Sequence, residues 1–350
     1  MNVKSKLIIG TRSSKLALWQ ADFVKDELKK IFPDIEIVLK EIKTKGDHIT
    51  DVAISKIGGK GLFTKEIEDA LLAKDIDLAV HSLKDLPTKL PDGLKIGAVL
   101  KREEPHDVLM VNHVIARRLK ESTKQSPSVL ENSQKIASSL SLLAMTQLPP
   151  NSKIGTSSLR RTAQLKALRA DLEYLDLRGN LDTRIRKLEE GQYDGIILAY
   201  AGVKRLGFED KITEHFNPKD ILPAVGQGAL AIEIRKGDKN IEDIISKLNH
   251  HETYLASIAE RVFLETLQGG CQVPIGAYSE IGNNKITLYG VIASLNGKKI
   301  VKDKNAGKLE MNECKSIGKS LAKTLLQMGG REILQDIDVE LLYRGASTSV

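Results

Sequence analysis

Short apolar runs alternate with helical patterns along two separate stretches of the chain, and this alternation restricts the fold more than any other feature. In the first stretch, residues 7–9, 35–39 and 77–80 are predicted strands. Residues 15–30 and 65–73 carry apolar side chains at the spacing of amphipathic helices. Strands that alternate with helices are typical of a parallel α/β sheet.

The same alternation returns further along the chain. Residues 152–154, 174–177 and 195–199 are predicted strands, and residues 158–170 and 181–190 are predicted helices. In both stretches a short strand ends in a Gly-Thr pair that opens a helix. We therefore expect two similar α/β lobes that face one another across a cleft.

A polar segment separates the two stretches. Residues 116–151 are rich in Ser, Lys, Gln and Asn, which is typical of a surface insertion or linker, although residues 140–145 within it favour a short helix. From about residue 250 the pattern changes to a helix, two hairpin-like strands and a final helix. A length of 350 residues fits two or three domains, and we expect the last to be a smaller α+β domain.

Composition excludes several classes of protein. Hydrophobic residues make up 41% of the chain and charged residues 28%, the balance of a globular protein with buried cores. No apolar run approaches the roughly 18 residues of a membrane helix, and the first ten residues lack the apolar core of a secretory signal, so we expect a cytoplasmic protein. The spacing of Cys271 and Cys314 fits neither a zinc site nor a disulfide framework, so we expect free thiols and no metal.

The formal net charge of +7 predicts an anionic partner, which could be a nucleic acid, an anionic lipid or an acidic small molecule. Aromatic residues are only 4% of the chain, too few for the stacking platforms of a single-strand binder. The two Gly-Thr segments point to a small anion, because free N–H groups and the helix dipole attract anions to helix N-termini. The polar residues of these segments are Arg12, Ser14, Thr156, Ser157, Ser158, Arg160 and Arg161. Ordinary capping with solvated arginines would explain either segment alone, but their repetition favours anion binding.

Three further arginines, Arg178, Arg184 and Arg205, follow predicted strands or lie in the helices after them. Ligands of α/β sheets bind beyond the carboxyl ends of the strands, and guanidinium groups match carboxylates bidentately. The arginines therefore predict a polycarboxylate or polyphosphate ligand, although each alone also fits a solvated surface charge.

Three loops carry residues with reactive chemistry. Lys84 and Asp85 follow a predicted strand and form a candidate acid–base pair, although such neighbours are also common on surfaces. Residues 57–63 are glycine-rich without Walker A spacing, so they predict a lid that carries Lys60 and Phe63. Cys271 lies in a glycine loop, which predicts an accessible thiol.

Together these segments resemble the porphobilinogen deaminase family over about residues 7–334. The matching segments are GTRSS at 10–14 with ALWQ at 17–20, GGKGLF at 58–63, HSLKD at 81–85, GTSSLRR at 155–161, LRGN at 177–180, LPAVGQG at 222–228 and GGCQVPIG at 269–276. Any one of them could arise by chance, but their common order makes the resemblance specific.

The resemblance implies a three-domain architecture. Two doubly wound lobes of the type II periplasmic-binding-protein kind are expected, with a cleft between them and a smaller α+β domain after them. Domain 1 would comprise residues 1–100 and 229–246, domain 2 residues 105–222 and domain 3 residues 250–350. The polar segment is longer than the usual link of the family, and the tail after residue 334 is also unfamiliar; the sequence gives neither their order nor their role.

The resemblance also implies a reaction of tetrapyrrole and haem biosynthesis. A transferase of this family condenses four porphobilinogen molecules head to tail, with loss of ammonia, on a covalently bound dipyrromethane primer, and hydrolysis then releases hydroxymethylbilane. Cys271 would attach the dipyrromethane cofactor through a thioether, Asp85 would be the catalytic carboxylate, and Lys60 and Phe63 would lie in a mobile loop. The implied cofactor and substrate contacts are Arg12, Ser14, Lys84, Thr156, Ser157, Ser158, Arg160, Arg161, Arg178, Arg184 and Arg205.

Two other functions account for part of the sequence. A two-lobed, non-catalytic anion-binding protein would explain the arginines and the Gly-Thr helix starts, but it gives no role to Cys271 or Asp85. A nucleic-acid binder would explain only the net charge. The resemblance implies a monomer with porphobilinogen as its small-molecule partner, and with neither a nucleic acid nor a membrane as partner.

Overall fold

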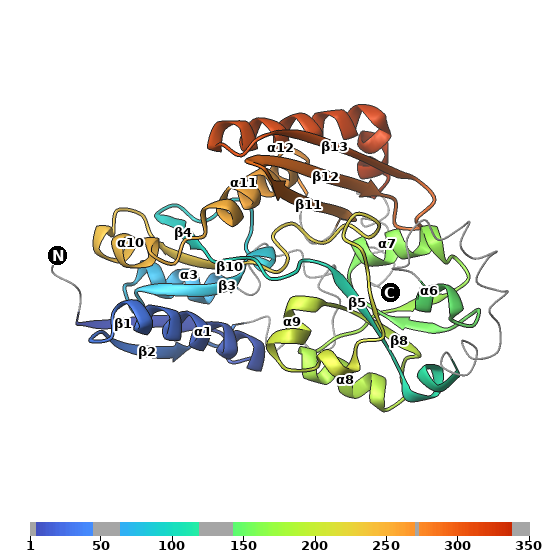
Figure 1. The fold of residues 1–350 in the computed structure, drawn as a ribbon, viewed down its shortest axis with the longest axis horizontal. Helices are drawn as coiled ribbons and strands as arrows, with labels where there is room; N and C mark the ends of the chain where they lie inside the picture. Colours follow the sequence, from blue (N-terminus) through green and yellow to red (C-terminus); the bar gives the residue numbers. More distant parts are fainter. Residues whose placement is uncertain (1–4, 45–63, 119–142, 270–272, 338–350) are drawn as a thin grey trace, which may run out of the picture.

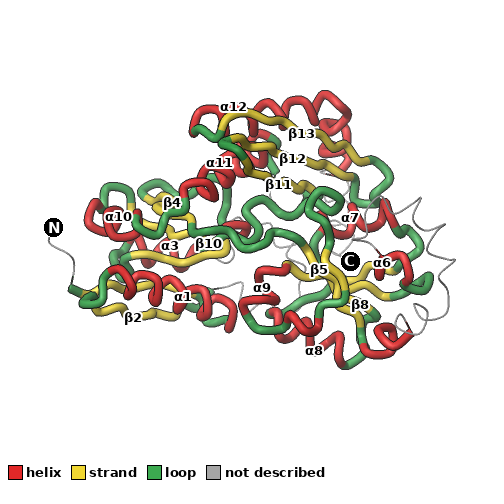
Figure 2. The backbone as a smooth tube through the Cα atoms, viewed as in Figure 1, coloured by secondary structure: helices red, strands yellow, loops and turns green. Residues whose placement is uncertain are grey.

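The computed structural model describes residues 5–44, 64–118, 143–269 and 273–337. Two five-stranded sheets form two lobes, and a smaller three-stranded sheet with two helices lies over both (Figure 1). We call the lobe that holds the first strand lobe 1, the other lobe 2, and the smaller unit the C-terminal domain. Figure 2 shows that helices and strands alternate through both lobes.

Lobe 1 has the strand order β2-β1-β3-β10-β4. Its strands are β1 (Lys6–Thr11), β2 (Glu36–Glu41), β3 (Leu78–Ser82), β4 (Leu94–Val99) and β10 (Leu230–Arg235). Its helices are α1 (Lys15–Ile31), α3 (Lys65–Leu72) and α10 (Lys239–Ser246). β1 runs parallel to β2 and β3, whereas β10 runs antiparallel to both of its neighbours. Ile232 and Ile234 of β10 are fully buried in the same core as Leu7 and Leu28.

Lobe 2 has the strand order β7-β6-β8-β5-β9. Its strands are β5 (Asp107–Val111), β6 (Lys153–Gly155), β7 (Glu173–Leu175), β8 (Gly195–Ala199) and β9 (Glu214–His215). Its helices are α6 (Leu143–Gln147), α7 (Leu159–Leu168), α8 (Leu181–Glu189) and α9 (Tyr200–Arg205), and a 3₁₀ turn, η4 (Glu209–Lys211), precedes β9. β6 runs parallel to β7 and β8, whereas β5 is antiparallel to β8 and β9.

The two sheets therefore share one topology, which confirms the expectation of two similar α/β lobes. The expectation of purely parallel sheets is wrong for one strand in each lobe. In both cases the antiparallel strand is the one that the chain delivers from the other lobe: β5 follows lobe 1, and β10 follows lobe 2. An apolar run indicates a buried strand but not the direction from which the chain enters the sheet.

Two crossing segments connect the lobes and touch one another. The first comprises residues 100–106 and the second residues 216–229. The amide of Leu100 donates to Leu230 (3.0 Å), and the amide of Glu103 donates to Gly228 (3.3 Å). Gly228 has φ +91°, and a Cβ at this position would lie 2.3 Å from the Glu103 carbonyl oxygen. Glycine is therefore required where the two segments meet.

The C-terminal domain has the α+β character expected from the sequence. Its strands β11 (Ile275–Gly282), β12 (Lys285–Ala293) and β13 (Ile300–Lys308) form an antiparallel sheet, covered by α11 (His251–Thr266) and α12 (Met311–Leu325). A π-helical turn, η5 (Leu326–Gly330), follows α12. Phe263, Leu288, Leu321 and the free thiol of Cys314 are buried in one core.

Most of the strands and helices predicted from periodicity are confirmed within one to five residues. Of the polar segment, residues 119–142 lie outside the described residues, and α6 overlaps the short helix expected at 140–145. The tail after residue 337 also lies outside them. Among the helices of the described part of the chain, none combines the length and the apolar character needed to span a membrane.

Candidate active site

Lys84 and Asp85 lie on a 3₁₀ turn, η2 (Leu83–Asp85), immediately after β3. Leu83 fixes the turn to the rest of lobe 1. Its side chain is buried, and its amide donates to the carbonyl of Ala229 (3.0 Å). Lys84 is half-buried, and Asp85 is exposed to solvent. The buried leucine thus fixes a turn that presents an exposed carboxylate at the end of a strand.

The hydroxyl groups of the two Gly-Thr segments form helix starts. Ser14 accepts from the amide of Ala17 (3.3 Å) at the start of α1, and Ser158 accepts from the amide of Arg161 (3.4 Å) at the start of α7. Thr156 accepts from the amide of Ser158 (3.3 Å). The expected capping geometry is therefore present at both segments, and it holds these side chains at the ends of β1 and β6.

Ser157 joins the start of α7 to the strand-end loop after β7. Its hydroxyl donates to the carbonyl of Leu177 (2.8 Å) and accepts from the amide of the same residue (3.0 Å). Arg178 comes directly after this contact, where it is half-buried and lies 3.4 Å from the carboxylate of Asp176. The serine thereby fixes the backbone that carries Arg178.

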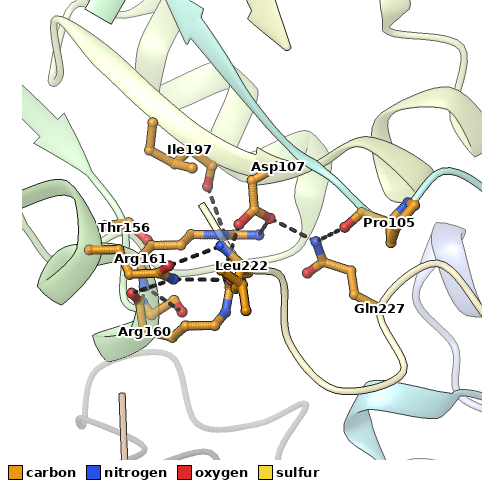
Figure 3. A network of polar contacts seen from close by, with 10 residues as sticks. Pro105, Asp107, Thr156, Arg160, Arg161, Ile197, Leu222 and Gln227 are labelled. Carbon is orange, nitrogen blue, oxygen red and sulfur yellow. Dashed lines mark hydrogen bonds and ion pairs between the residues drawn. The ribbon is translucent and has the colours of Figure 1, made fainter. Parts of the chain in front are cut away.

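Arg160 and Arg161 lie in a buried network around Asp107 (Figure 3). Arg160 donates to one carboxylate oxygen of Asp107 (2.7 Å), and Arg161 donates to the other (2.7 Å). Arg160 also donates to the carbonyl of Leu222 (2.8 Å), and Arg161 to that of Ile197 (2.9 Å). These arginines therefore tie α7 to β5, to β8 and to the second crossing segment.

Asp107 and Gln227 also belong to this network, and neither is among the site residues predicted from the sequence. Asp107 begins β5, so a single carboxylate stands at the edge of an otherwise apolar run, and that pattern could have singled it out. Gln227 donates to Pro105 (2.6 Å) and to Asp107 (2.8 Å), so it joins the two crossing segments at the network. Arg160 and Arg161 hold the pKa of Asp107 well below its usual range, although burial opposes them.

The network carries excess positive charge, because two guanidinium groups share one carboxylate. Lys84 lies within electrostatic range of all three side chains. Removal from water lowers the pKa of Lys84 to about 8; Asp85 opposes this effect, and Arg161 adds to it. The surroundings of Lys84 thus disfavour its charged ammonium form. An anionic ligand nearby would favour that form.

Arg184 and Arg205 extend the positive region in lobe 2. Arg184 donates to the carbonyl of Gly179 (2.8 Å), and removal from water lowers its pKa to about 10. Arg161 lowers the pKa of Arg184 further, whereas Asp85 raises it, so the carboxylate of lobe 1 acts on a guanidinium of lobe 2. Arg205 donates to Gly228 (2.7 Å) and lies 5.8 Å from the ring of Trp19, so it too bridges the lobes.

Arg12 is half-buried between the end of β1 and the start of α1. Three of the expected site residues, Lys60, Phe63 and Cys271, lie outside the described residues. The described chain reaches Gly269 after α11 and resumes at Val273 before β11.

The described residues fit a ligand with carboxylate groups and pyrrole N–H groups. Among them, the Nε of Arg161 and the Oε1 of Gln227 are buried without a hydrogen-bond partner. The first is an unused charged donor, and the second an unused acceptor. A dipyrromethane supplies the complementary groups, since its side-chain carboxylates accept hydrogen bonds and its ring nitrogens donate them.

Comparisons with known proteins cover nearly the whole chain. A family model described as "Porphobilinogen deaminase, dipyromethane cofactor binding domain" matches residues 7–243, and one described as "Porphobilinogen deaminase, C-terminal domain" matches residues 254–327. The porphobilinogen deaminase of Carboxydothermus hydrogenoformans is 50% identical over 335 residues, 96% of this chain and 98% of its own. That of Chlorobium luteolum is 46% identical over 337 residues, 96% of this chain and 99% of its own.

Solved structures match only distantly. The probable amino-acid ABC transporter extracellular-binding protein ytmK from Bacillus subtilis aligns with a TM-score of 0.36 and 11% identity, over 71% of this chain and 90% of its own. The two-lobed architecture is established instead by the strand orders of the two sheets.

Proposed function

The chain belongs to the porphobilinogen deaminase family, and we propose that Asp85 is the carboxylate at which its condensation steps occur. The enzyme is a transferase of porphyrin biosynthesis that joins four porphobilinogen molecules head to tail and releases hydroxymethylbilane. A dipyrromethane cofactor supplies the free pyrrole carbon to which units are added. The alternative of a non-catalytic anion-binding protein has no comparable support.

One observation carries the assignment of Asp85. It is an exposed carboxylate on a turn held by buried contacts, and its charge acts on Lys84 beside it and on Arg184 of the other lobe. When porphobilinogen loses ammonia, positive charge develops on its methylene carbon and ring nitrogen. A carboxylate fixed in position lowers the energy of that charge without reorganisation during the step.

The cations of the candidate site, of which Lys84 and Arg184 are within electrostatic range of Asp85, would bind the acetate and propionate groups of substrate and product. They comprise Arg12, Lys84, Arg160, Arg161, Arg178, Arg184 and Arg205, and Ser14, Thr156, Ser157 and Ser158 form the helix starts beside them. Each added pyrrole brings two more carboxylates, so the positive excess of the site favours elongation over loss of the chain. Each of Arg160 and Arg161 already donates a hydrogen bond to Asp107. The two guanidinium groups would therefore attract the substrate carboxylates through the one positive charge that Asp107 does not neutralise.

We propose Cys271 as the thioether attachment of the cofactor and Lys60 and Phe63 as parts of a mobile loop over the substrate. The support for Cys271 is its place between α11 and β11 in the family's glycine loop, together with the burial of Cys314 in the C-terminal core. A buried thiol with a pKa raised by burial is a poor nucleophile.

We also propose domain limits of 1–100 and 229–246, 105–222, and 250–350, and a cytoplasmic monomer with neither a nucleic acid nor a membrane as partner. The limits agree with the sheets that hold each strand. A small anionic substrate explains the arginines of the site, so they do not require a nucleic acid or an anionic membrane as partner.

The test is Asp85→Asn, with Asp92→Asn as its control. Asp92 is another exposed carboxylate of lobe 1, seven residues further along the chain. We expect Asp85→Asn to keep the mass of two pyrrole units on the peptide that contains Cys271, but to lose at least about 100-fold in turnover. Asp92→Asn should match the parent enzyme. Near-normal turnover of Asp85→Asn would refute the role of this carboxylate.

A second variant tests the attachment and the alternative function together. We expect Cys271→Ser to carry no cofactor mass after incubation with porphobilinogen and to form no product. If the protein were only an anion binder, Cys271→Ser would bind porphobilinogen as the parent does, and the parent itself would acquire no adduct.

A further inference from the structure

The chain segment after Asp85 is held by one side chain of the C-terminal domain. Arg261, on α11, donates to three consecutive backbone carbonyls, those of Leu86 (3.3 Å), Pro87 (2.6 Å) and Thr88 (3.0 Å). Arg261 is half-buried, and removal from water lowers its pKa, with Glu265 and Glu233 opposing. Burial thus disfavours the charge of the Arg261 guanidinium, and its hydrogen bonds to the three carbonyls offset part of that cost.

These carbonyls need an outside donor because of the local sequence. The carbonyls of Leu86, Pro87 and Thr88 come after the turn η2, which ends at Asp85, so the hydrogen bonding of the turn does not use them. Pro87 has no amide hydrogen and holds Leu86 in an extended conformation (φ −79°, ψ 133°), so the turn cannot continue. A planar guanidinium with five donors can meet three carbonyls at once, whereas an ammonium group meets them less well.

The same helix also holds the second crossing segment and leads to the anchor loop. Glu260 accepts from the amide of Gly226 (2.8 Å) and from Arg102 (2.6 Å). α11 ends at Thr266, five residues before Cys271. α11 therefore links three parts of the site: the turn with Asp85, the crossing segment beneath that turn, and the loop with the proposed attachment cysteine.

We propose that Arg261 is a positioning residue for the condensation reaction, holding Asp85 at a fixed place relative to the anchored pyrrole chain. The proposal rests on the role of Asp85 proposed above. Because a displacement of about 1 Å can cost about 100-fold in rate, loosening of the turn should lower kcat. Most of the cations proposed to bind the substrate (Arg160, Arg161, Arg178, Arg184 and Arg205) lie in lobe 2, so KM should change less than kcat.

The test compares Arg261→Lys and Arg261→Met with a matched control, Arg169→Lys. Arg169 also donates to three backbone carbonyls, those of Met145, Thr146 and Leu148, but it does so in lobe 2 beside α6. We expect Arg261→Lys to lower kcat about 10-fold and Arg261→Met about 100-fold, with KM for porphobilinogen within twofold and the cofactor mass retained. Arg169→Lys should lower thermal stability by about as much as Arg261→Lys does. It should leave kcat unchanged.

A double variant separates this proposal from the role of Asp85. If Arg261 acts through Asp85, adding Arg261→Met to Asp85→Asn should cause little further loss of kcat. A full further 100-fold loss would overturn the positioning role while leaving that of Asp85 intact. Unchanged kcat in Arg261→Lys and Arg261→Met, measured where both are folded, would overturn it as well. An active Asp85→Asn would instead refute the proposed function directly.

Discussion

Lys84 shows how a single side chain can report on the site. Its pKa is lowered to about 8 by removal from water, so its ammonium charge disappears as the pH rises through that value. In the unfolded chain the same group keeps its proton to about pH 10.4. Between these values the unfolded state binds more protons, so the contribution of Lys84 to stability rises with pH while its attraction for anions falls.

We predict that kcat/KM for porphobilinogen declines above about pH 8 and that Lys84→Arg moves this decline to higher pH. The arginine keeps its charge throughout the accessible range. The measurement is the pH profile of kcat/KM from pH 7 to 10, with Lys89→Arg, an exposed lysine of the same loop, as the control. Identical profiles for the parent and Lys84→Arg would contradict the prediction.

The residues of the site could be predicted only in part from the sequence. Arg160 and Arg161 stand out because two cations at a helix start oppose the dipole, and that conflict indicates an anion. The sequence does not show that one anionic partner of both arginines is a carboxylate of the protein itself. That carboxylate is Asp107, more than 50 residues away in the chain. Contacts of this kind depend on the sheet order, which periodicity does not encode.

Among the elements, the two crossing segments meet at a position that leaves little room for substitution. Gly228 combines a positive φ with a backbone carbonyl 2.3 Å from its missing Cβ, and it also accepts from Arg205. Gly237 has a similar φ of +83°, but a Cβ there would meet nothing within 4 Å. The two glycines therefore separate the cost of backbone strain from the cost of the clash.

We predict that Gly237→Ala lowers the free energy of unfolding by about 1 kcal/mol, the cost of a left-handed conformation. Gly228→Ala should lower it by about 3 kcal/mol or more, since the carbonyl of Glu103 must also move. Denaturant unfolding of both variants measures the difference. Equal losses of stability in Gly237→Ala and Gly228→Ala would contradict the prediction, because they would mean that the carbonyl of Glu103 moves away at no cost.

The sequence predicted six of the ten described strands of these lobes and left out β4, β5, β9 and β10 and, among the described helices, α9 and α10. Turn residues flank both β5 and β10, but β5 is a short apolar run that periodicity alone cannot tell from a segment of buried helix. Their antiparallel direction follows from the crossing of the chain between lobes. The helix α1 could be predicted because apolar side chains recur along it at helical spacing, and Val24 and Leu28 among them are buried in the core of lobe 1.

At the scale of the whole molecule, Glu260 joins the C-terminal domain to both crossing segments. This fully buried carboxylate accepts from Arg102, from the amide of Gly226 and from the amide of Ser279 (2.9 Å). Arg102 in turn donates to the carbonyl of Gln227 (2.7 Å). The C-terminal sheet, α11 and the two crossing segments therefore meet around one buried ion pair.

We predict that Glu260→Gln lowers the free energy of unfolding by about 3–5 kcal/mol, because the charge of Arg102 loses its buried partner. Calorimetry should show the C-terminal domain unfolding before the lobes. Glu252→Gln, an exposed carboxylate in the first turn of α11, should cost less than about 1 kcal/mol. A single transition at the parent temperature in Glu260→Gln would contradict this account.

The strand order of lobe 1 has a consequence for synthesis on the ribosome. β10 lies between β3 and β4, yet 130 residues, 100–229, separate it from β4 in the chain. At roughly 5–20 residues per second, lobe 1 waits about 7–26 s for its inner strand. All strands of lobe 2 lie within residues 107–215, so they leave the ribosome before β10 does. The N-terminal lobe is thus the second to be completed, and nascent β3 and β4 keep unpaired edges until translation passes residue 235.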